Sequence, residues 1–191
     1  MLIYSMGVSA DGFIADDEGG FDFTAPSDEQ FRFQAAQVAK LGAYLLGRRL
    51  YETMRVWETD PSLRAPRSGV TFADTWAALP KVVFSRTLTE VEGNARLATG
   101  SVEAEVAAAL ASADGDVSIG GADLAAEAIR LDLVDEYRLF RYPVVIGGGI
   151  RYWPALERRL PLSLVGTRTF GGRVVYEEYR RVRYADSAAA V

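Results

Sequence analysis

Short apolar segments with strand character alternate with helical segments along the chain as far as residue 142. The strands are expected over residues 2–8, 43–46, 81–85, 116–119 and 134–142. Beyond them, apolar stretches flank Gly171 and Gly172, which is typical of a β-hairpin. This alternation predicts one α/β domain over residues 1–185, a three-layer α/β/α sandwich with a mainly parallel mixed sheet and a C-terminal antiparallel hairpin. Residues 186–191 are small or polar and are expected to be a disordered tail.

The first helix carries signals at both ends. Ser27 is suited to cap its start, with Gln30 as the capping-box partner. Gly42 is expected to end it, just before the strand at residues 43–46.

The 191-residue chain contains neither cysteine nor histidine. Zinc sites built on these residues, thiol nucleophiles, disulfides and Ser-His-Asp triads are therefore excluded. The Asp-rich loop typical of calcium sites is also missing, and we expect no metal. Proton transfer would depend on Asp, Glu, Tyr, Lys or water.

The net charge of −5 disfavours binding to nucleic acid or to an anionic membrane. The sequence has no apolar run of about 18 residues and does not start with a secretory signal, so we expect a cytoplasmic protein. Any phosphate group must therefore be held by a local site.

Gly120 and Gly121 stand between an expected strand and an expected helix. The free N–H groups and the dipole of a helix N-terminus favour an anion, and glycine lets its backbone approach closely. The alternative is that the two glycines only form a tight turn.

Two further strand ends carry residues suited to phosphate. Gly47, Arg48 and Arg49 follow one strand, where an arginine could form two parallel hydrogen bonds to phosphate oxygens. Ser85 and Arg86 follow another, where a hydroxyl beside a guanidinium suits a phosphate monoester. The alternative for the first segment is a solvated helix start, and the alternative for the second is a turn. The sequence lacks both the G-x-G-x-x-G fingerprint and the P-loop, so the nucleotide would need a different site.

These segments together resemble the dihydrofolate-reductase-like family. The resemblance is carried, in order, by residues 8–15, 47–52, 85–87 and 120–124. Residues 131–137 and the stretch from Pro143 to Gly149 resemble more closely the reductase domain of bacterial riboflavin biosynthesis. The similarity spans nearly the whole chain.

The resemblance implies a site for NADPH across the strand ends. It places the pyrophosphate near Arg48 and the stretch Gly121, Ala122, Asp123 and Leu124, and the 2′-phosphate near Arg49, Ser85 and Arg86. It places the nicotinamide near Val8, Ser9 and Ile14. It also implies a cis peptide bond between Gly120 and Gly121.

Asp11 and Asp28 are the candidate catalytic residues. Folate reductases carry a carboxylate near the start of the first helix, and Asp28 is the nearest match; a helix-dipole role is the alternative. Asp11 could touch the substrate or merely stabilise a turn.

The expected activity is hydride transfer from NADPH to a small heterocycle, either pterin-like or a ribosylaminopyrimidine of riboflavin biosynthesis. The resemblance also implies a possible homodimer. We expect no zinc deaminase domain of the kind that often accompanies such reductases, because its ligands would be His and Cys. The alternative is a module that binds NADPH as a sensor or interaction protein with weak catalysis.

Overall fold

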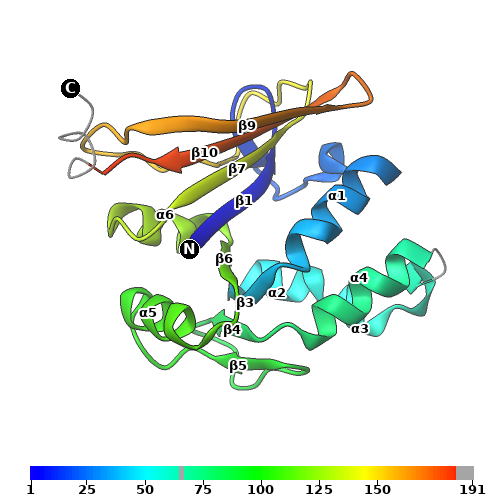
Figure 1. Cartoon of the computed structure of the whole chain (residues 1–191), viewed down its shortest axis with the longest axis vertical. Coiled ribbons are helices and arrows are strands. Elements are labelled where there is room, and N and C mark those ends of the chain that lie inside the picture. Colours follow the sequence, from blue (N-terminus) through cyan, green and yellow to red (C-terminus); the bar gives the residue numbers. More distant parts are fainter. Residues whose placement is uncertain (65–66, 184–191) are drawn as a thin grey trace.

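The computed structural model describes residues 1–64 and 67–183, apart from the side chains of Arg67 and Ser68, so the predicted tail lies outside it. The strands of the main sheet are β1 (Leu2–Val8), β3 (Leu41–Gly47), β4 (Lys81–Phe84), β5 (Ala95–Leu97), β6 (Asp116–Gly120), β7 (Glu136–Arg141), β9 (Leu162–Phe170) and β10 (Val174–Arg181). Among the described residues they form an eight-stranded sheet in the order β5-β4-β3-β6-β1-β7-β10-β9 (Figure 1).

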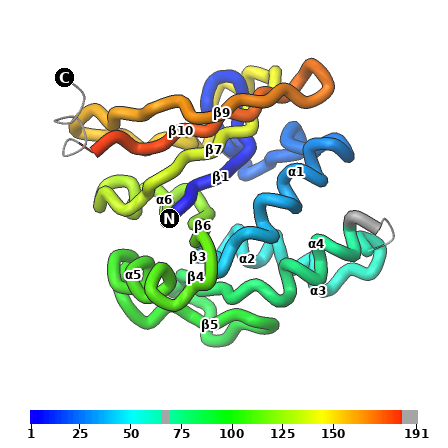
Figure 2. The backbone as a smooth tube through the Cα atoms, viewed as in Figure 1, coloured from blue at the N-terminus to red at the C-terminus, as the bar shows by residue number. Residues whose placement is uncertain are grey.

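The first strand lies in the middle of this sheet, between β6 and β7 (Figure 2). The pairings from β5 across to β7 are parallel, whereas β10 is antiparallel to both β7 and β9. The predicted mainly parallel sheet with a C-terminal hairpin is therefore confirmed. The carboxyl ends of β1, β3, β4 and β6 consequently meet at one edge of the sheet.

Helices cover both faces of the sheet. They are α1 (Asp28–Val38), α2 (Arg48–Met54), α3 (Val56–Thr59), α4 (Arg67–Ala78), α5 (Val102–Ser112) and α6 (Ala122–Arg130), with short 3-10 turns η1 (Asp22–Thr24) and η2 (Pro61–Arg64). Helices α5 and α6 pack on one face, and α1, α2 and α4 lie on the other (Figure 1). A small second sheet pairs β2 (Phe13–Ala15) with β8 (Ile150–Arg151). None of the described helices is long and apolar enough to cross a membrane.

The core is divided by the sheet. Val117 and Ile119 of β6 are buried together with residues of α5 and α6. On the opposite face, Leu46 and Val83 are buried with residues of α4. Apolar side chains on both faces are expected for parallel strands that helices cover on both sides.

Two details of the first helix differ from the predictions. Ser27 does cap α1, since its hydroxyl accepts from the N–H of Gln30, but the Gln30 side chain is buried against Tyr142 instead of returning to the cap. Helix α1 ends at Val38, and Gly42 lies inside β3. A Cβ at Gly42 would lie 2.9 Å from the main-chain N of Asp114. Close backbone approach, and not a helix end, therefore explains this glycine.

Glu105, in the first turns of α5, forms hydrogen bonds to β5 and to the segment that follows it. Its side chain accepts from the N–H groups of Thr99, at 2.7 Å, and Gly100, at 3.1 Å, and from Arg96 at 2.6 Å. The hydrogen bond from Arg96 is the largest of the effects that lower the pKa of Glu105 to about 2. The ionised form of this residue, which is only 5% exposed, therefore stabilises the fold.

We expect Glu105 to make the free energy of unfolding depend on pH in the acidic range. Because its pKa is lower in the folded than in the unfolded chain, its contribution is complete above the ordinary value of 4.5 and disappears as the pH falls towards 2. Glu105→Gln should lower the free energy of unfolding by about 1–3 kcal/mol at pH 7, and by less at pH 3.5. Urea unfolding at both pH values measures this, with the exposed Glu127→Gln as control. An equal loss at both pH values would contradict it.

Candidate functional site

The main chains of β3 and β6 lie in close contact where the two strands end, with Gly47 on one side and Gly120 and Gly121 on the other. Leu46 pairs with Gly120 in the parallel ladder. A Cβ at Gly121 would lie 3.4 Å from both the Cα and the N of Gly47. A side chain at Gly120 would collide with Leu50 and would lie 3.1 Å from the Tyr44 ring. The edge therefore offers a backbone surface that a flat or anionic group can approach.

Helix α6 begins directly at this surface. Gly121 is its N-cap, has no side chain to cap the helix, and turns the backbone at a φ of 97°. The first helical hydrogen bond runs from the N–H of Ala125 to the carbonyl of Gly121. The N–H groups of residues 122–124 therefore precede the helical bonding pattern, and with the helix dipole they form a site suited to phosphate.

The bond between Gly120 and Gly121 is trans, so the expectation of a cis bond is wrong. The φ of Gly121, which only glycine adopts readily, makes the turn into α6.

A hydrogen bond between a guanidinium and a hydroxyl group connects the residues that follow β3 and β4. Arg48 donates from Nη1 to Oγ1 of Thr87 at 3.2 Å, and its Nε lies 3.9 Å from Glu52. The hydroxyl of Ser85 accepts from the N–H groups of Thr87 and Leu88. Thr87, the last residue of the segment 85–87, therefore connects the end of β4 to Arg48.

Arg48, Arg49 and Arg86 are all exposed. Their guanidinium groups are therefore accessible to an anion at the edge where β3 and β4 end. The structure thus brings the predicted residues of the β3, β4 and β6 ends to one side of the sheet.

The predicted nicotinamide neighbours lie at the end of β1. Val8 and Ile14 are buried in the core that α6 covers. Ser9 is fully buried, and its hydroxyl accepts from the N–H of Phe13 while donating to Asp11. These residues form a rigid wall at the end of β1, and their contact with a nicotinamide stays a prediction.

Asp11 connects two loops. One carboxylate oxygen accepts from the Ser9 hydroxyl at 2.6 Å and from the N–H of Ile146, and the other accepts from the N–H of Gly147 at 2.8 Å. The bond from Ser9 contributes most to lowering the pKa of Asp11, with the two N–H groups adding to it. A carboxyl group with a lowered pKa is a weak source of protons near neutral pH, so the geometry favours a loop-positioning role. Its catalytic role stays a prediction.

The buried polar residue near the start of α1 is Gln30, not Asp28. Asp28 is the first residue of the helix and is exposed, as a carboxylate that interacts with the helix dipole would be. Gln30 is only 1% exposed and donates from Nε2 to the hydroxyl of Tyr142 at 2.5 Å. The sequence signal for Gln30 was its capping-box position, which concealed this inward orientation.

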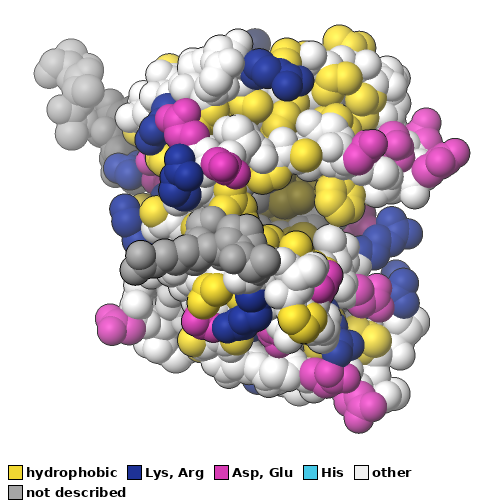
Figure 3. Space-filling view, turned by 90° about the vertical axis from the view of Figure 1, so that its right-hand side faces the viewer, with side chains coloured by type: hydrophobic (Ala, Val, Ile, Leu, Met, Phe, Trp, Pro, Cys, Tyr) yellow, Lys and Arg dark blue, Asp and Glu magenta, His cyan; other side chains and the backbone are white. Residues whose placement is uncertain are grey.

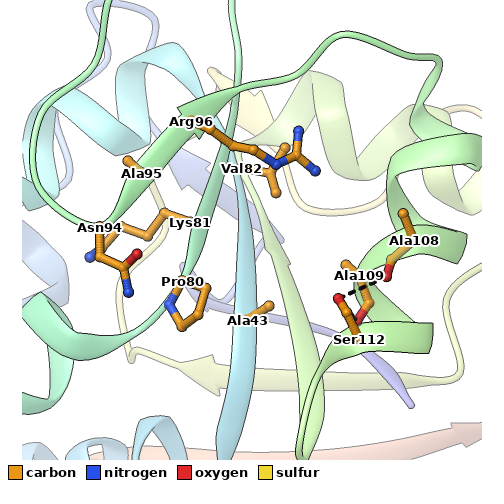
Figure 4. Close-up of a pocket in the computed structure, with 10 residues that line it drawn as sticks. All are labelled: Ala43, Pro80, Lys81, Val82, Asn94, Ala95, Arg96, Ala108, Ala109 and Ser112. Carbon is orange, nitrogen blue, oxygen red and sulfur yellow. Dashed lines mark hydrogen bonds between the residues drawn. The ribbon is translucent and has the colours of Figure 1, made fainter.

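Two cavities in the described part of the chain lie away from these strand ends. One is a groove of about 610 Å³ between α1 and α4. It lies on the side of the molecule that Figure 3 shows, where the surface is hollowed and bordered by apolar side chains. The other, of about 260 Å³, lies at the amino ends of β4 and β5 near Lys81 and Arg96 (Figure 4). Lys81 there donates to the carbonyls of Trp76 and Leu79. Neither cavity is lined by the predicted site residues.

Comparison with solved structures agrees with this geometry. A putative riboflavin biosynthesis protein from Shewanella sp. PV-4 superposes with a TM-score of 0.77 at 23% identity, over 95% of this chain and 99% of that one. Dihydrofolate reductase from Enterococcus faecalis, solved in complex with NADP(H), superposes with a TM-score of 0.62 at 18% identity, over 96% and 97% of the two chains. The dihydrofolate-reductase-like fold is therefore confirmed.

Sequence comparison defines the family. The uncharacterized protein YyaP of Bacillus subtilis (strain 168) is 30% identical over 180 residues, which is 93% of each chain. Residues 1–176 match the family model described as the RibD C-terminal domain. The predicted resemblance to the reductase domain of riboflavin biosynthesis is thereby confirmed, and the chain belongs to the RibD C-terminal domain family.

Proposed function

We propose that this protein is an NADPH-dependent reductase that acts on a small heterocycle, such as a ribosylaminopyrimidine or a pterin-like compound. One observation carries the proposal. The main chains of Gly47 and Gly121 are in contact at the N-terminus of α6, and neither residue has a side chain that would cover it. The reductase-like family and fold support it.

The residues at the strand ends fit the phosphates of this cofactor. In the proposed complex, the N–H groups of residues 122–124 and the Arg48 guanidinium hold the pyrophosphate. Arg49, Ser85 and Arg86 hold the 2′-phosphate, which distinguishes NADPH from NADH. Val8, Ser9 and Ile14 wall the nicotinamide.

When bound, NADPH supplies the hydride that reduces a C=N or C=O bond. The reduction also consumes one proton, which has to come from water or from an Asp, Glu, Tyr or Lys side chain because the chain contains no histidine or cysteine. The protein's task is therefore to orient the two reactants and to exclude bulk water.

A second candidate function follows from the two predicted catalytic carboxylates. Asp28 is exposed, and both oxygens of Asp11 are engaged by the protein itself. This arrangement is compatible with a protein that binds NADPH and catalyses little, acting as a sensor or an interaction module.

One experiment distinguishes these functions. NADPH is titrated into the protein while its fluorescence and the Tm are followed, and absorbance decay is then measured with dihydrofolate and with riboflavin-pathway intermediates. The reductase should bind NADPH and oxidise it with at least one substrate. Binding without turnover would favour the second function, and lack of binding would contradict both.

Arg86→Ala should weaken NADPH binding by about tenfold or more, because a hydrogen bond to a charged group contributes about 1.5–3 kcal/mol. Affinity for NADH, which lacks the 2′-phosphate, should stay unchanged. Isothermal titration with both cofactors measures this, with Arg130→Ala at the opposite end of α6 as the matched control. Equal losses for NADPH and NADH would refute the assignment of the 2′-phosphate.

Gly121→Ala should weaken NADPH and NADH alike, since it alters the backbone that both pyrophosphates approach. Alanine at a φ of 97°, with its Cβ 3.4 Å from Gly47, should also cost about 1–3 kcal/mol of stability. Gly171→Ala, in the open hairpin turn at a φ of 56°, is the control for backbone strain alone. If Gly121→Ala left the affinity for both cofactors unchanged, the pyrophosphate would have to bind elsewhere.

A further inference from the structure

The groove between α1 and α4 has an apolar floor and is open to solvent. Its volume is about 610 Å³, and its lining includes Arg32, Ala35 and Ala36 of α1, Ala39 directly after it, and Phe72 of α4. Phe72 is buried, whereas Ala36 and Ala39 are exposed. Figure 3 shows the hollowed, apolar surface on this side of the molecule. The groove is therefore a surface that a partner can reach.

Aromatic packing holds the floor of the groove. The ring of Phe72 lies 5.5 Å from that of Phe31 in α1 and 4.6 Å from that of Trp57 in α3, measured between ring centroids. Trp76, one turn further along α4, is stacked on Phe72 and is almost fully buried. These contacts fix α4 against α1, so the groove is already formed before any partner binds. A preformed surface loses little conformational entropy on association.

The α1 side of the groove can accept another helix. Residues three or four positions apart lie on the same helix face, so one stripe along α1 is formed by Asp28, Arg32, Ala35 and Ala39. The alanines present only methyl groups, which allows a second helix to approach to about 8 Å, the short end of the usual range. An α-helix is therefore an occupant whose shape matches this surface.

The charges on this side of α1 are unevenly distributed. Asp28 and Glu29 lie in the first turn of the helix, and Lys40 follows its last turn. Glu29 is paired with Arg168. Asp28 and Lys40 are exposed, and their side chains form no hydrogen bond or ion pair with any other residue that the structure describes. The helix thus has an acidic end and a basic end, each with a charge available to a partner.

A second copy of the same face supplies the complementary charges if the two helices run antiparallel. Each acidic end then lies beside the basic end of the other copy. With the two-fold axis at the level of Gln34, Asp28 faces Lys40 of the second copy. Arg32 then faces Ala36, whose methyl group leaves room for the longer side chain. A parallel arrangement would place like charges side by side, which is unfavourable.

Helix α4 makes the arrangement reciprocal. The α1 helix of each copy occupies the groove between α1 and α4 of the other, so the same surface is used twice and the assembly closes as a dimer. Burial of the apolar groove supplies the affinity, because exposed charge pairs contribute little to it. The charges mainly determine which partner binds and in which direction.

We propose that the protein forms a two-fold symmetric dimer in which α1 of each copy lies antiparallel in the α1–α4 groove of the other. Asp28, which is exposed in the single chain, then pairs with Lys40 of the second copy. The groove contains none of the residues proposed to hold NADPH, so this dimer and the proposed function are tested separately.

Sedimentation equilibrium over a range of protein concentrations tests this dimer. The wild-type chain should be a dimer, and Asp28→Lys should raise its dissociation constant at least tenfold, because two Asp–Lys contacts become Lys–Lys contacts. Lys40→Asp, which creates two Asp–Asp contacts, should have a similar effect. Exchanging both charges in Asp28→Lys/Lys40→Asp should restore a dissociation constant within threefold of wild type.

Glu103→Lys is the matched control. Glu103 is exposed in the first turn of α5, as Asp28 is in α1, so its replacement removes the same kind of interaction with a helix dipole. It should leave the dissociation constant of the dimer within twofold of wild type. Equal weakening by Glu103→Lys and Asp28→Lys would show a general effect of charge and would overturn the proposal.

Ala36→Arg tests the groove itself, whether or not the charge variants fold. Position 36 is exposed in the single chain, so the fold should tolerate arginine there. Its side chain would meet Arg32 of the second copy and should prevent dimerisation. A monomeric wild type, a dimer that Ala36→Arg leaves intact, or a charge exchange that fails to restore the dimer would each overturn the proposal.

Discussion

The approach of Gly47 and Gly121 is the constraint on which the rest of the site depends. Their backbones lie in van der Waals range, Gly121 turns the chain at a φ that favours glycine, and α6 starts where β6 ends. The parallel pairing of β3 with both β6 and β4 then brings Arg48 and Ser85 to the same edge. This edge of the sheet thereby combines a backbone surface, a helix N-terminus and several guanidinium groups.

Much of this arrangement could be predicted from the sequence because it depends on local signals. Gly120 and Gly121 mark a strand–helix junction, and Ser27 marks a helix start, from nearest neighbours alone. Gly42 was assigned to the wrong element because its reason is the approach of Asp114, more than 70 positions away in the sequence. Asp11 could not be placed for the same reason, since its partners at residues 146 and 147 belong to a distant loop.

The rotation of α1 about its axis shows the same limit. The sequence indicates where this helix begins, but only packing against β7 and β10 decides which side chain faces inward. Phe33 packs on the rings of Phe140 and Tyr176, and this contact turns Gln30 towards Tyr142 while Asp28 remains in solvent. The polar side chain that α1 buries at this end is therefore the neutral Gln30, whereas the candidate named from the sequence, Asp28, is exposed. The residues predicted to hold phosphates lie together where β3, β4 and β6 end, and their contact with a cofactor stays a prediction.

The most direct test of the central claim is a crystal structure of the protein grown with NADP⁺. The account predicts that the pyrophosphate lies against the N–H groups of residues 122–124 beside Gly47, with the 2′-phosphate next to Arg86. A dinucleotide bound in another part of the molecule, or no bound dinucleotide at saturating concentration, would contradict it.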